Sequence, residues 1–362
     1  MTPNSGPVRT AIIGAGLAGA ACAAGLMSSG TAVTVFERSR AAGGRIATRR
    51  AGWIDVDGAE QSATFDYGAH ACAPVRPRFK AVMSRAMTAG CIEGWHPHVY
   101  AARPVDAGPC LVASPQTSTL CDHLLAGATV VLDCTVRRLQ RAVDGQWYVV
   151  ADGRPLAGPF DQVAIAIPPA QAALLLAGHQ DAWADNLMAK RMQACWTLMA
   201  VTDDVDWPWD AAEPERGPLA WVLRNDRMPG RVTPRGVAVW TAHATCEWSE
   251  ARLNHDSRAV SAELTSALRA QLPASRPGGG PVRWHHAAVH HWRQAGPMLD
   301  RADGSNSDEC WWDAALGLGV AGDVLAGGGV EAAWHSGDEL ADRMAFSSEQ
   351  TDAAPQVATT VP

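Results

Sequence analysis

The chain has 362 residues, of which 47% are hydrophobic and 19% are charged, and its formal net charge is −7. This composition is typical of a globular protein with a large core, and the length predicts two closely packed domains. The acidic balance argues against a nucleic-acid partner, and no apolar run approaches the roughly 18 residues that span a bilayer.

The cysteines and the N-terminal residues indicate a cellular compartment. The nine cysteines occur without C-x-x-C spacing, which is typical of reduced, mostly buried thiols in a cytosolic protein. The first seven residues lead directly into a predicted strand, without the apolar region of a signal peptide. We therefore expect a cytoplasmic protein. Scarce lysine beside abundant arginine and alanine favours a bacterial coding bias.

The first half of the chain alternates between strand and helix patterns. The predicted elements are a β-α-β unit at 8–37, a hairpin within 40–72, helices at 78–90 and 117–125, and strands at 130–136, 147–151 and 163–167. Asp144-Gly145 is expected to turn between the first two of these strands. Pro168-Pro169 opens a further helix.

The second half is richer in tryptophan and reads mainly as antiparallel strands from about residue 190 to 300. The further predicted elements are a helix at 247–272, strands at 282–292 and 316–322, and a final helix at 330–346. Small polar residues predict a disordered tail at 347–362. Elements of a nucleotide-binding type thus open and close the chain around a β-rich insert.

A glycine-rich turn, Gly14-x-Gly16-x-x-Gly19, directly follows the first predicted strand and opens the first helix. Gly14 permits the tight turn, Gly16 lets the backbone approach a pyrophosphate, and Gly19 lets the helix pack close to the strand. The helix N-terminus at Leu17 and Ala18 offers N–H groups and a positive dipole end to phosphates. The motif predicts a dinucleotide site without separating NAD from FAD.

An acid and a second glycine pair follow this turn. Glu37, next to Arg38, ends the second strand, where a carboxylate can hold ribose hydroxyls. Gly43 and Gly44 allow backbone N–H groups to face a second part of a phosphate chain, and Arg45 supplies a planar charged donor. The short spacing between these elements favours one shared site over an ordinary surface turn.

A third element lies near the end of the chain. Gly322-Asp323 follows a predicted buried strand, where an acid can bind a ribityl hydroxyl. A helix that starts near Gly329 and Val330 would point its positive end at an electron-rich ring edge and stabilise an anionic reduced flavin. This return of the chain to the cofactor favours a flavoprotein over an NAD-dependent dehydrogenase.

The three elements resemble the pattern of the amine-oxidase-like flavoprotein superfamily. Stretches such as A-G-G-R-I-A-T-R, F-D-Y-G-A-H, L-A-W-V-L-R-N-D-R-M-P-G-R and V-A-G-D-V-L-A-G-G-G-V-E resemble, more specifically, the renalases and their bacterial relatives. The likeness covers nearly the whole chain. It implies an α/β fold with a Rossmann-type domain that binds FAD noncovalently and a second, α+β substrate domain on an antiparallel sheet. The expected boundaries are 1–75, 108–188 and 305–346 for the FAD domain, and 76–107 and 189–304 for the substrate domain.

The resemblance also implies an activity. Renalases oxidise dihydronicotinamide isomers that carry the hydride at the wrong ring carbon, and oxygen then reoxidises the flavin and yields hydrogen peroxide. A small-molecule substrate and oxygen are therefore the expected partners, with the oligomeric state left open. Asn225, His243 and Trp292 match family positions near the substrate face of the flavin, and Val136 matches a position beside the adenine.

Next to the flavin the family pattern matches Gly68, Ala69, His70 and Ala71, but His70-Ala71 stands where renalases have a Gln-Tyr pair. Gln294 likewise replaces an aromatic residue of bacterial members. These departures leave a second hypothesis open, an FAD-dependent amine oxidase or desaturase of a biosynthetic pathway, in which His70 or His243 acts as a base. A flavin-binding protein without turnover is the third hypothesis.

Two other features bear on these alternatives. Amine oxidases of the superfamily often use a lysine near the flavin to hold a water, and neither Lys80 nor Lys190 lies in a suitable predicted element. Oxidation of a dihydropyridine needs no base, because hydride loss restores aromaticity. His285, His286, His290 and His291 share one strand and invite a metal interpretation, but no cysteine or carboxylate cluster accompanies them, so no metal is expected.

Overall fold

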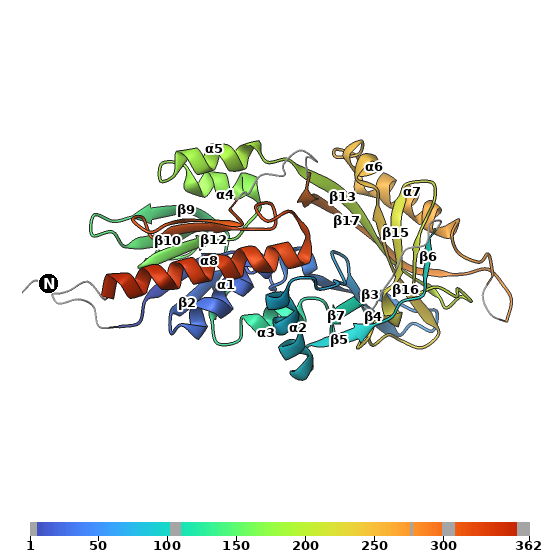
Figure 1. Ribbon diagram of the computed structural model, residues 1–362. Coiled ribbons are helices and arrows are strands. Elements are labelled where there is room, and N and C mark those ends of the chain that lie inside the picture. The colour runs from blue at the N-terminus through green and yellow to red at the C-terminus, as the bar shows by residue number, and fades with distance from the viewer. Residues whose placement is uncertain (1–5, 102–109, 276–277, 299–307, 353–362) are drawn as a thin grey trace, which may run out of the picture.

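The computed structural model describes residues 6–101, 110–275, 278–298 and 308–352, and two six-stranded sheets dominate this part of the chain (Figure 1). One sheet lies with the blue and red ends of the described chain, and the other lies at the opposite end of the molecule among yellow and orange elements (Figure 1). The long paired strands β13 (Met192–Asp203) and β17 (Trp284–Pro297) reach from the second sheet toward the first.

The first sheet has the strand order β18-β19-β12-β1-β2-β8 and is parallel except at its edge strand β18. Its strands are β1 Arg9–Ile13, β2 Ala32–Phe36, β8 Thr129–Val131, β12 Gln162–Ile165, β18 Cys310–Asp313 and β19 Leu318–Ala321. Alternate residues of β1 are buried in two different cores, Ala11 and Ile13 in one and Ile12 in the other. A parallel sheet of this kind must be covered on both faces.

Helices cover one face, and a small sheet with two helices covers the other. The first cover consists of α1 Leu17–Ser28, α2 Pro77–Thr88, α3 Thr119–Leu124 and α8 Gly329–Asp352. The second consists of β9 Val136–Arg141, β10 Trp147–Ala151, β11 Ala157–Phe160, α4 Pro169–Leu176 and α5 Asp181–Ala189. Helices α1 and α8 pack so closely that a Cβ on Gly337 would lie 2.0 Å from the Ala18 carbonyl oxygen. The last described helix thus packs against the first (Figure 1).

The second sheet has the order β17-β13-β16-β15-β14-β6 and is antiparallel except at the pairing of β14 with β6. Its remaining strands are β6 Val99–Ala101, β14 Ala211–Glu213, β15 Leu219–Arg224 and β16 Val237–Ala244. Helix α7 (Ser257–Arg269) packs Val260, Leu264 and Leu268 against one face. The hairpin of β3 (Thr48–Ile54) and β4 (Glu60–Asp66) packs Trp53 and Phe65 against the other.

Most of the predicted elements are confirmed, including the β-α-β unit, the hairpin within 40–72 and the antiparallel strands after residue 190. The single strand predicted at 130–136 is wrong. Two strands occur there, because Asp133 adopts a left-handed φ of 49° between them. Strand β8 pairs with β2, whereas β9 pairs with β10 through the predicted turn at Asp144-Gly145.

The helix predicted at 247–272 is also divided, into α6 (Cys246–Glu250) and α7. The Asp256 side chain accepts hydrogen bonds from the backbone N–H groups of Arg258 and Ala259, so it caps a new helix. The final helix extends past the predicted limit of residue 346 to Asp352, which contradicts the expectation of a disordered tail over those residues. Residues 353–362 of the expected tail lie outside the described residues.

Two short strands, β5 (Ile92–Trp95) and β7 (Cys110–Ala113), connect the sheets near α2. Helix α2 packs Phe79 and Met83 in the core of the first sheet. The residue boundaries of the two domains stay a prediction.

Among the described residues, no helix combines the length and the apolar character that a membrane crossing requires.

Candidate active site

In the glycine-rich turn after β1, the packing of the protein requires glycine at two of the three motif positions. Gly14 has a φ of 106°, and a Cβ there would lie 2.4 Å from the Ala166 carbonyl oxygen. A Cβ on Gly19 would lie 2.0 Å from the Gly14 carbonyl oxygen. Gly16 differs, because its φ of −74° suits any residue and its nearest neighbour would be the Gly44 Cα, 4.0 Å away. The surface beside Gly16 is therefore open, as close approach by a pyrophosphate requires.

The acid and the second glycine pair meet this turn in space. Glu37 is buried directly after β2, and its Oε2 accepts a hydrogen bond of 2.9 Å from the Ala15 N–H. The Gly43 N–H donates to the Ala15 carbonyl oxygen, and a Cβ on Gly44 would lie 3.2 Å from the Gly16 Cα. These contacts combine two motifs into one cradle at the N-terminus of α1, where Leu17 and Ala18 begin the helix.

Val136 and Arg38 are also expected at this end of the cofactor, and the contacts of the structure support only Val136. Val136 begins β9, and the preceding segment lies beside the acid, because the Cys134 N–H donates to the Glu37 carbonyl oxygen. Arg38 instead points its guanidinium toward Gln171 of α4, at 3.4 Å. The structure therefore keeps Val136 near the cradle and gives no contact that would bring Arg38 to it.

Segments from the N-terminal and C-terminal parts of the described chain meet at an ion pair. Arg45 donates from Nη1 to Oδ2 of Asp323 at 2.9 Å and from Nη2 to Oδ1 at 2.5 Å, across 278 positions in the sequence. Asp323 is buried, whereas the Arg45 side chain is about one-third exposed. Gly322 is fixed by its N–H bond to the Ser336 hydroxyl of α8, whose first residue is Gly329. The Gly-rich cradle, the acid and this pair fit an extended dinucleotide such as FAD.

Beside Arg45 lies a cavity of about 260 Å³. Its walls come from the glycine-arginine loop at Gly43-Gly44-Arg45, the segment after β4, and strands β13, β15, β16 and β17. The lining residues are Arg45, Gly68, Ala69, His70, Cys195, Trp221, His243, Trp292 and Ala295. His70, His243 and Trp292 are thus brought together, as expected.

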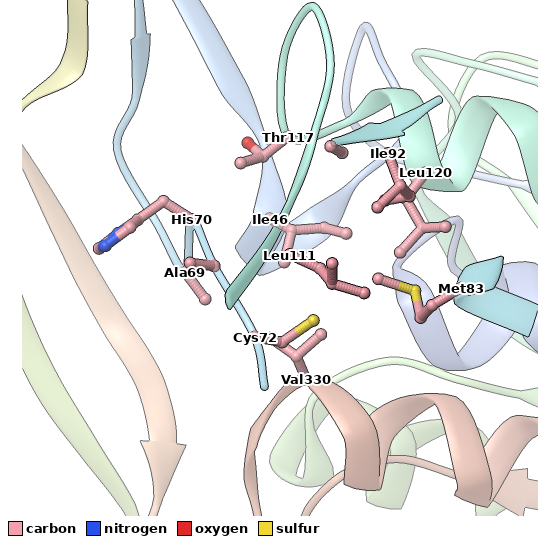
Figure 2. Close-up of a pocket in the computed structure, with 12 residues that line it drawn as sticks. Ile46, Ala69, His70, Cys72, Met83, Ile92, Leu111, Thr117, Leu120 and Val330 are labelled. Atoms are coloured by element: carbon pink, nitrogen blue, oxygen red, sulfur yellow. The ribbon is translucent and has the colours of Figure 1, made fainter. Parts of the chain in front are cut away.

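The segment after β4 separates this cavity from a second, smaller one. Ala69 and Cys72 line a space of about 20 Å³ with Ile46, Leu111 and Val330 (Figure 2). The imidazole of His70 points away from these apolar side chains (Figure 2). Its ring lies instead 6.2 Å from the rings of both His243 and Trp221.

Three of the lining residues, Cys195, Trp221 and Ala295, were not predicted. Trp221 of β15 pairs with His243 of β16, and Cys195 of β13 pairs with Trp292 of β17. Trp221 and Cys195 are thus the cross-strand partners of predicted residues. The strand register would have indicated both, but the sequence alone does not determine that register.

The two histidines of the cavity are held neutral. Burial, and secondly the proximity of His243, lower the pKa of His70 to about 4, whereas Asp66 acts in the opposite direction. Burial also lowers the pKa of His243, opposed by its hydrogen bond to the backbone of Tyr67. At pH 7 both imidazoles therefore offer one N–H donor and one acceptor.

A single carbonyl group orients the far wall of the cavity. The Tyr67 carbonyl oxygen accepts from His243 Nε2 at 3.1 Å and from Trp292 Nε1 at 3.0 Å. Because a carbonyl only accepts, His243 must carry its proton on Nε2, which leaves Nδ1 as an acceptor. The Tyr67 ring stacks on Trp292 at 4.8 Å between ring centroids.

Asn225 is not among the residues that line the cavity with His70, His243 and Trp292. Its side chain is fully buried, its Oδ1 accepts from the Asp66 N–H at 2.9 Å, and its Nδ2 donates to the Thr64 carbonyl oxygen at 3.1 Å. Both polar groups of the amide are thus used to hold β4. Asn225 supports the cavity from behind and is not one of its lining residues.

Contacts within the protein account for histidines of β17 that were considered as metal ligands. His285 hydrogen-bonds Asp203, and His291 stacks on Trp196 at 4.2 Å, whereas His290 packs against Tyr67. The histidines thus divide between several neighbours. Among the described residues, no group of three or more His, Cys, Asp or Glu side chains is placed to hold a metal ion.

The pKa of His70 predicts a pH-dependent stability. The unfolded chain takes up this proton near pH 6.5 and the folded chain only near pH 4, so stabilisation by neutral His70 is complete above pH 6.5 and is lost as the pH falls toward 4. The loss attributable to His70 between pH 7 and pH 5 is about 2 kcal/mol. His70→Gln should remove it in urea unfolding measurements at the two pH values. The exposed His255→Gln serves as the matched control, and equal losses in the two variants would contradict the prediction.

Comparison with known proteins supports the fold. The family model described as an NAD(P)-binding Rossmann-like domain matches residues 12–86. The cyclohexylamine oxidase of Brevibacterium oxydans is similar in structure, with a TM-score of 0.70 and 12% identity over 95% of this chain and all of that one. A putrescine oxidase solved with putrescine has a TM-score of 0.57 and 13% identity over 93% of this chain and 99% of that one.

A candidate protoporphyrinogen oxidase from Exiguobacterium gives a similar result, with a TM-score of 0.64 and 12% identity over 94% of this chain and 99% of that one. At these identities the likeness shows a shared fold. The predicted fold class is therefore confirmed: a mixed α/β protein with a Rossmann-like dinucleotide-binding domain and a second unit on a largely antiparallel sheet.

Proposed function

We propose that the chain is an FAD-dependent oxidoreductase of the amine-oxidase-like superfamily that oxidises a reduced nicotinamide or a similar small heterocycle, with oxygen as the electron acceptor. The observation that carries this proposal is the cavity of about 260 Å³, which adjoins Arg45 of the cofactor cradle and is lined by two neutral histidines and two indoles. The shared fold with solved oxidases supports the reaction class.

The cofactor side uses residues from both ends of the chain. The open surface at Gly16 and the N–H groups at the start of α1 suit the pyrophosphate, Glu37 suits the ribose of the adenosine, and Asp323 suits a ribityl hydroxyl. Bound FAD would supply the hydride acceptor and transfer the two electrons on to oxygen, which with two protons gives hydrogen peroxide. Arg45 lies between this cradle and the cavity and lines both.

The substrate side suits a flat, uncharged ring. Trp221 and Trp292 offer aromatic faces, and His243 offers its Nδ1 acceptor to a substrate N–H such as a carboxamide. Loss of a hydride from a dihydropyridine leaves an aromatic pyridinium ring, so no residue has to remove a proton. A cavity whose imidazoles are neutral at pH 7 is consistent with such a reaction.

Oxidation of an amine remains the second candidate, because two of the similar structures are oxidases named for amines. The chemistry of the walls is less favourable to it. The one charged side chain among the lining residues of the described cavity is Arg45, a cation, so a protonated amine has no carboxylate partner there. With a pKa of about 4, His70 is also a weak base near neutral pH.

The test is anaerobic mixing of the purified flavoprotein with dihydronicotinamides that carry the hydride at different ring carbons, and with a panel of amines. We expect at least one nicotinamide isomer to bleach the visible flavin absorbance, and the admission of oxygen to restore it with release of peroxide. His70→Gln combined with Ala71→Tyr, which restores the renalase residues, should increase the rate of bleaching. Bleaching by amines alone would establish the second candidate, and a flavoprotein that no compound reduces would point to binding without turnover.

A further inference from the structure

A buried ion pair lies next to the cavity-lining segment after β4 and joins Asp66 and Arg231, two residues that the proposed reaction does not use. Arg231, at the end of R-M-P-G-R, donates from Nε and Nη2 to Oδ2 of Asp66 at 2.8 and 2.6 Å. Both side chains are 1% exposed. A Cβ on Gly230 would lie 2.0 Å from the Ser114 hydroxyl oxygen, so glycine there lets the loop pass closely enough for Arg231 to enter.

Both carboxylate oxygens of Asp66 accept several hydrogen bonds. Its Oδ1 accepts from the Thr117 N–H at 3.1 Å, from the Thr117 hydroxyl at 2.9 Å and from the Thr48 hydroxyl at 2.5 Å. Nη1 of Arg231 continues to the carbonyl oxygens of Ala113 and Pro229. Three other segments of the chain, at Thr48, Thr117 and Arg231, are thereby tied to one carboxylate at the last residue of β4.

The same residue is anchored through its backbone, because its N–H donates to Asn225 Oδ1. The next residue is Tyr67, whose carbonyl oxygen accepts from His243 and Trp292. One peptide unit thus separates the buried ion pair from the group that orients two walls of the cavity. A shift or rotation of β4 at Asp66 would change both hydrogen bonds at once.

We propose that Asp66 and Arg231, together with Asn225, are positioning residues of the cavity. They fix the Tyr67 carbonyl, which keeps His243 as the Nε2–H tautomer with Nδ1 free to accept, and holds the Trp292 indole in place. The assignment of this cavity to substrate rests on the proposed function, whereas the state of the two side chains can be measured without it.

Stability alone does not explain an ion pair at this position. A buried pair contributes little net stability compared with apolar side chains of similar volume, because both charges lose their hydration. What an arginine that donates two N–H groups to one carboxylate oxygen adds is a defined geometry. The pair is therefore expected to affect the orientation of its neighbours more than its net contribution to folding would suggest.

The test compares Arg231→Lys with Arg224→Lys in the flavin-bound protein. Arg224 is a matched control, since its side chain is 3% exposed and paired with Asp226 at 2.7 Å, and its hydrogen bonds and ion pairs among the described residues go to Asp204 and Asp226 instead of to Asp66. Each change replaces a planar fork by a point charge. Nitrogen-15 NMR of the histidine rings and indole N–H groups reports the His243 tautomer and the Trp292 environment, and steady-state kinetics separate kcat from KM.

In Arg231→Lys we expect His243 to become a mixture of tautomers and the Trp292 indole signal to shift. The kcat should fall by up to ~100-fold, the loss that a misplacement of about 1 Å can cause. Arg224→Lys should lower the melting temperature without either spectral change. Unchanged His243 and Trp292 signals in folded Arg231→Lys would overturn the proposal.

A milder variant applies if Arg231→Lys does not fold. Thr117→Val keeps the shape of the side chain and removes one hydroxyl bond to Asp66, and it should shift the same two signals in the same direction. Unchanged signals in this folded variant would also reject the positioning role. Failure of every nicotinamide to reduce the flavin would refute the proposed substrate and leave these spectra as they are, so the two failures are distinguishable.

Discussion

Gly16→Ala is expected to weaken FAD binding by roughly 10- to 100-fold while the apoprotein remains folded. The backbone at this position already has a φ of −74°, and the added methyl would lie 4.0 Å from its nearest protein neighbour. The stability of the apoprotein should therefore change by no more than about 1 kcal/mol. The methyl group would occupy the open surface that a pyrophosphate must approach, which is why the loss should appear in the cofactor affinity alone.

Gly19→Ala provides the contrast. Its Cβ would lie 2.0 Å from the Gly14 carbonyl oxygen, so the turn and α1 must separate and the apoprotein itself should be destabilised. Urea unfolding of the two apoproteins and FAD titration followed by fluorescence quenching would separate the effects. Normal FAD affinity in Gly16→Ala would show that the cofactor does not approach this turn.

The cofactor cradle could be predicted because its signals are local. Gly14, Gly19 and Glu37 belong to a motif in which each residue has a stereochemical reason within one β-α-β unit. The contacts of Ala15 with Glu37 and with Gly43 agree with that interpretation. Short-range patterns of this kind fix the shape of the backbone before any long-range pairing is known.

The substrate cavity could be predicted only in part, because it depends on long-range pairing. Trp221 and Cys195 enter the wall through their cross-strand partners His243 and Trp292, and hydrophobic alternation does not specify which strands pair. Asn225 matched a family position, yet its amide is used within the protein, on β4. A polar residue in a motif can therefore act on the backbone behind a site instead of on the ligand.

The divided helix after Cys246 shows a local signal that the prediction overlooked. Asp256 and the residues after it have the pattern of an N-cap, and the structure shows both capping hydrogen bonds. The apolar periodicity fits α7 but continues across the start of that helix at Ser257. Capping residues would have placed the boundary, whereas hydrophobic periodicity alone does not.

Asp323→Ala is expected to weaken FAD binding by about 10- to 150-fold, because a hydrogen bond to a charged group is worth about 1.5–3 kcal/mol. The carboxylate is buried and already bonded to Arg45 through both oxygens, each of which has a further lone pair for a ribityl hydroxyl. The loss of folding stability should be smaller, since the Arg45 side chain is about one-third exposed and water can solvate it. FAD titration and urea unfolding of the apoprotein measure the two quantities.

A matched control for this change is Asp338→Ala, on the terminal helix, where the carboxylate is paired with Arg78 at 2.7 Å and takes no part in the cradle. It should lower stability and leave FAD affinity unchanged. If Asp323→Ala lowers stability but leaves FAD affinity unchanged, as in the control, the role of the ion pair is only to join the segments around Arg45 and Asp323. If FAD affinity falls in Asp323→Ala alone, the cofactor needs a residue 278 positions away from the glycine-arginine loop. The C-terminal segment would then be part of the binding site, and the close packing of α8 on α1 would be the means by which the fold delivers it.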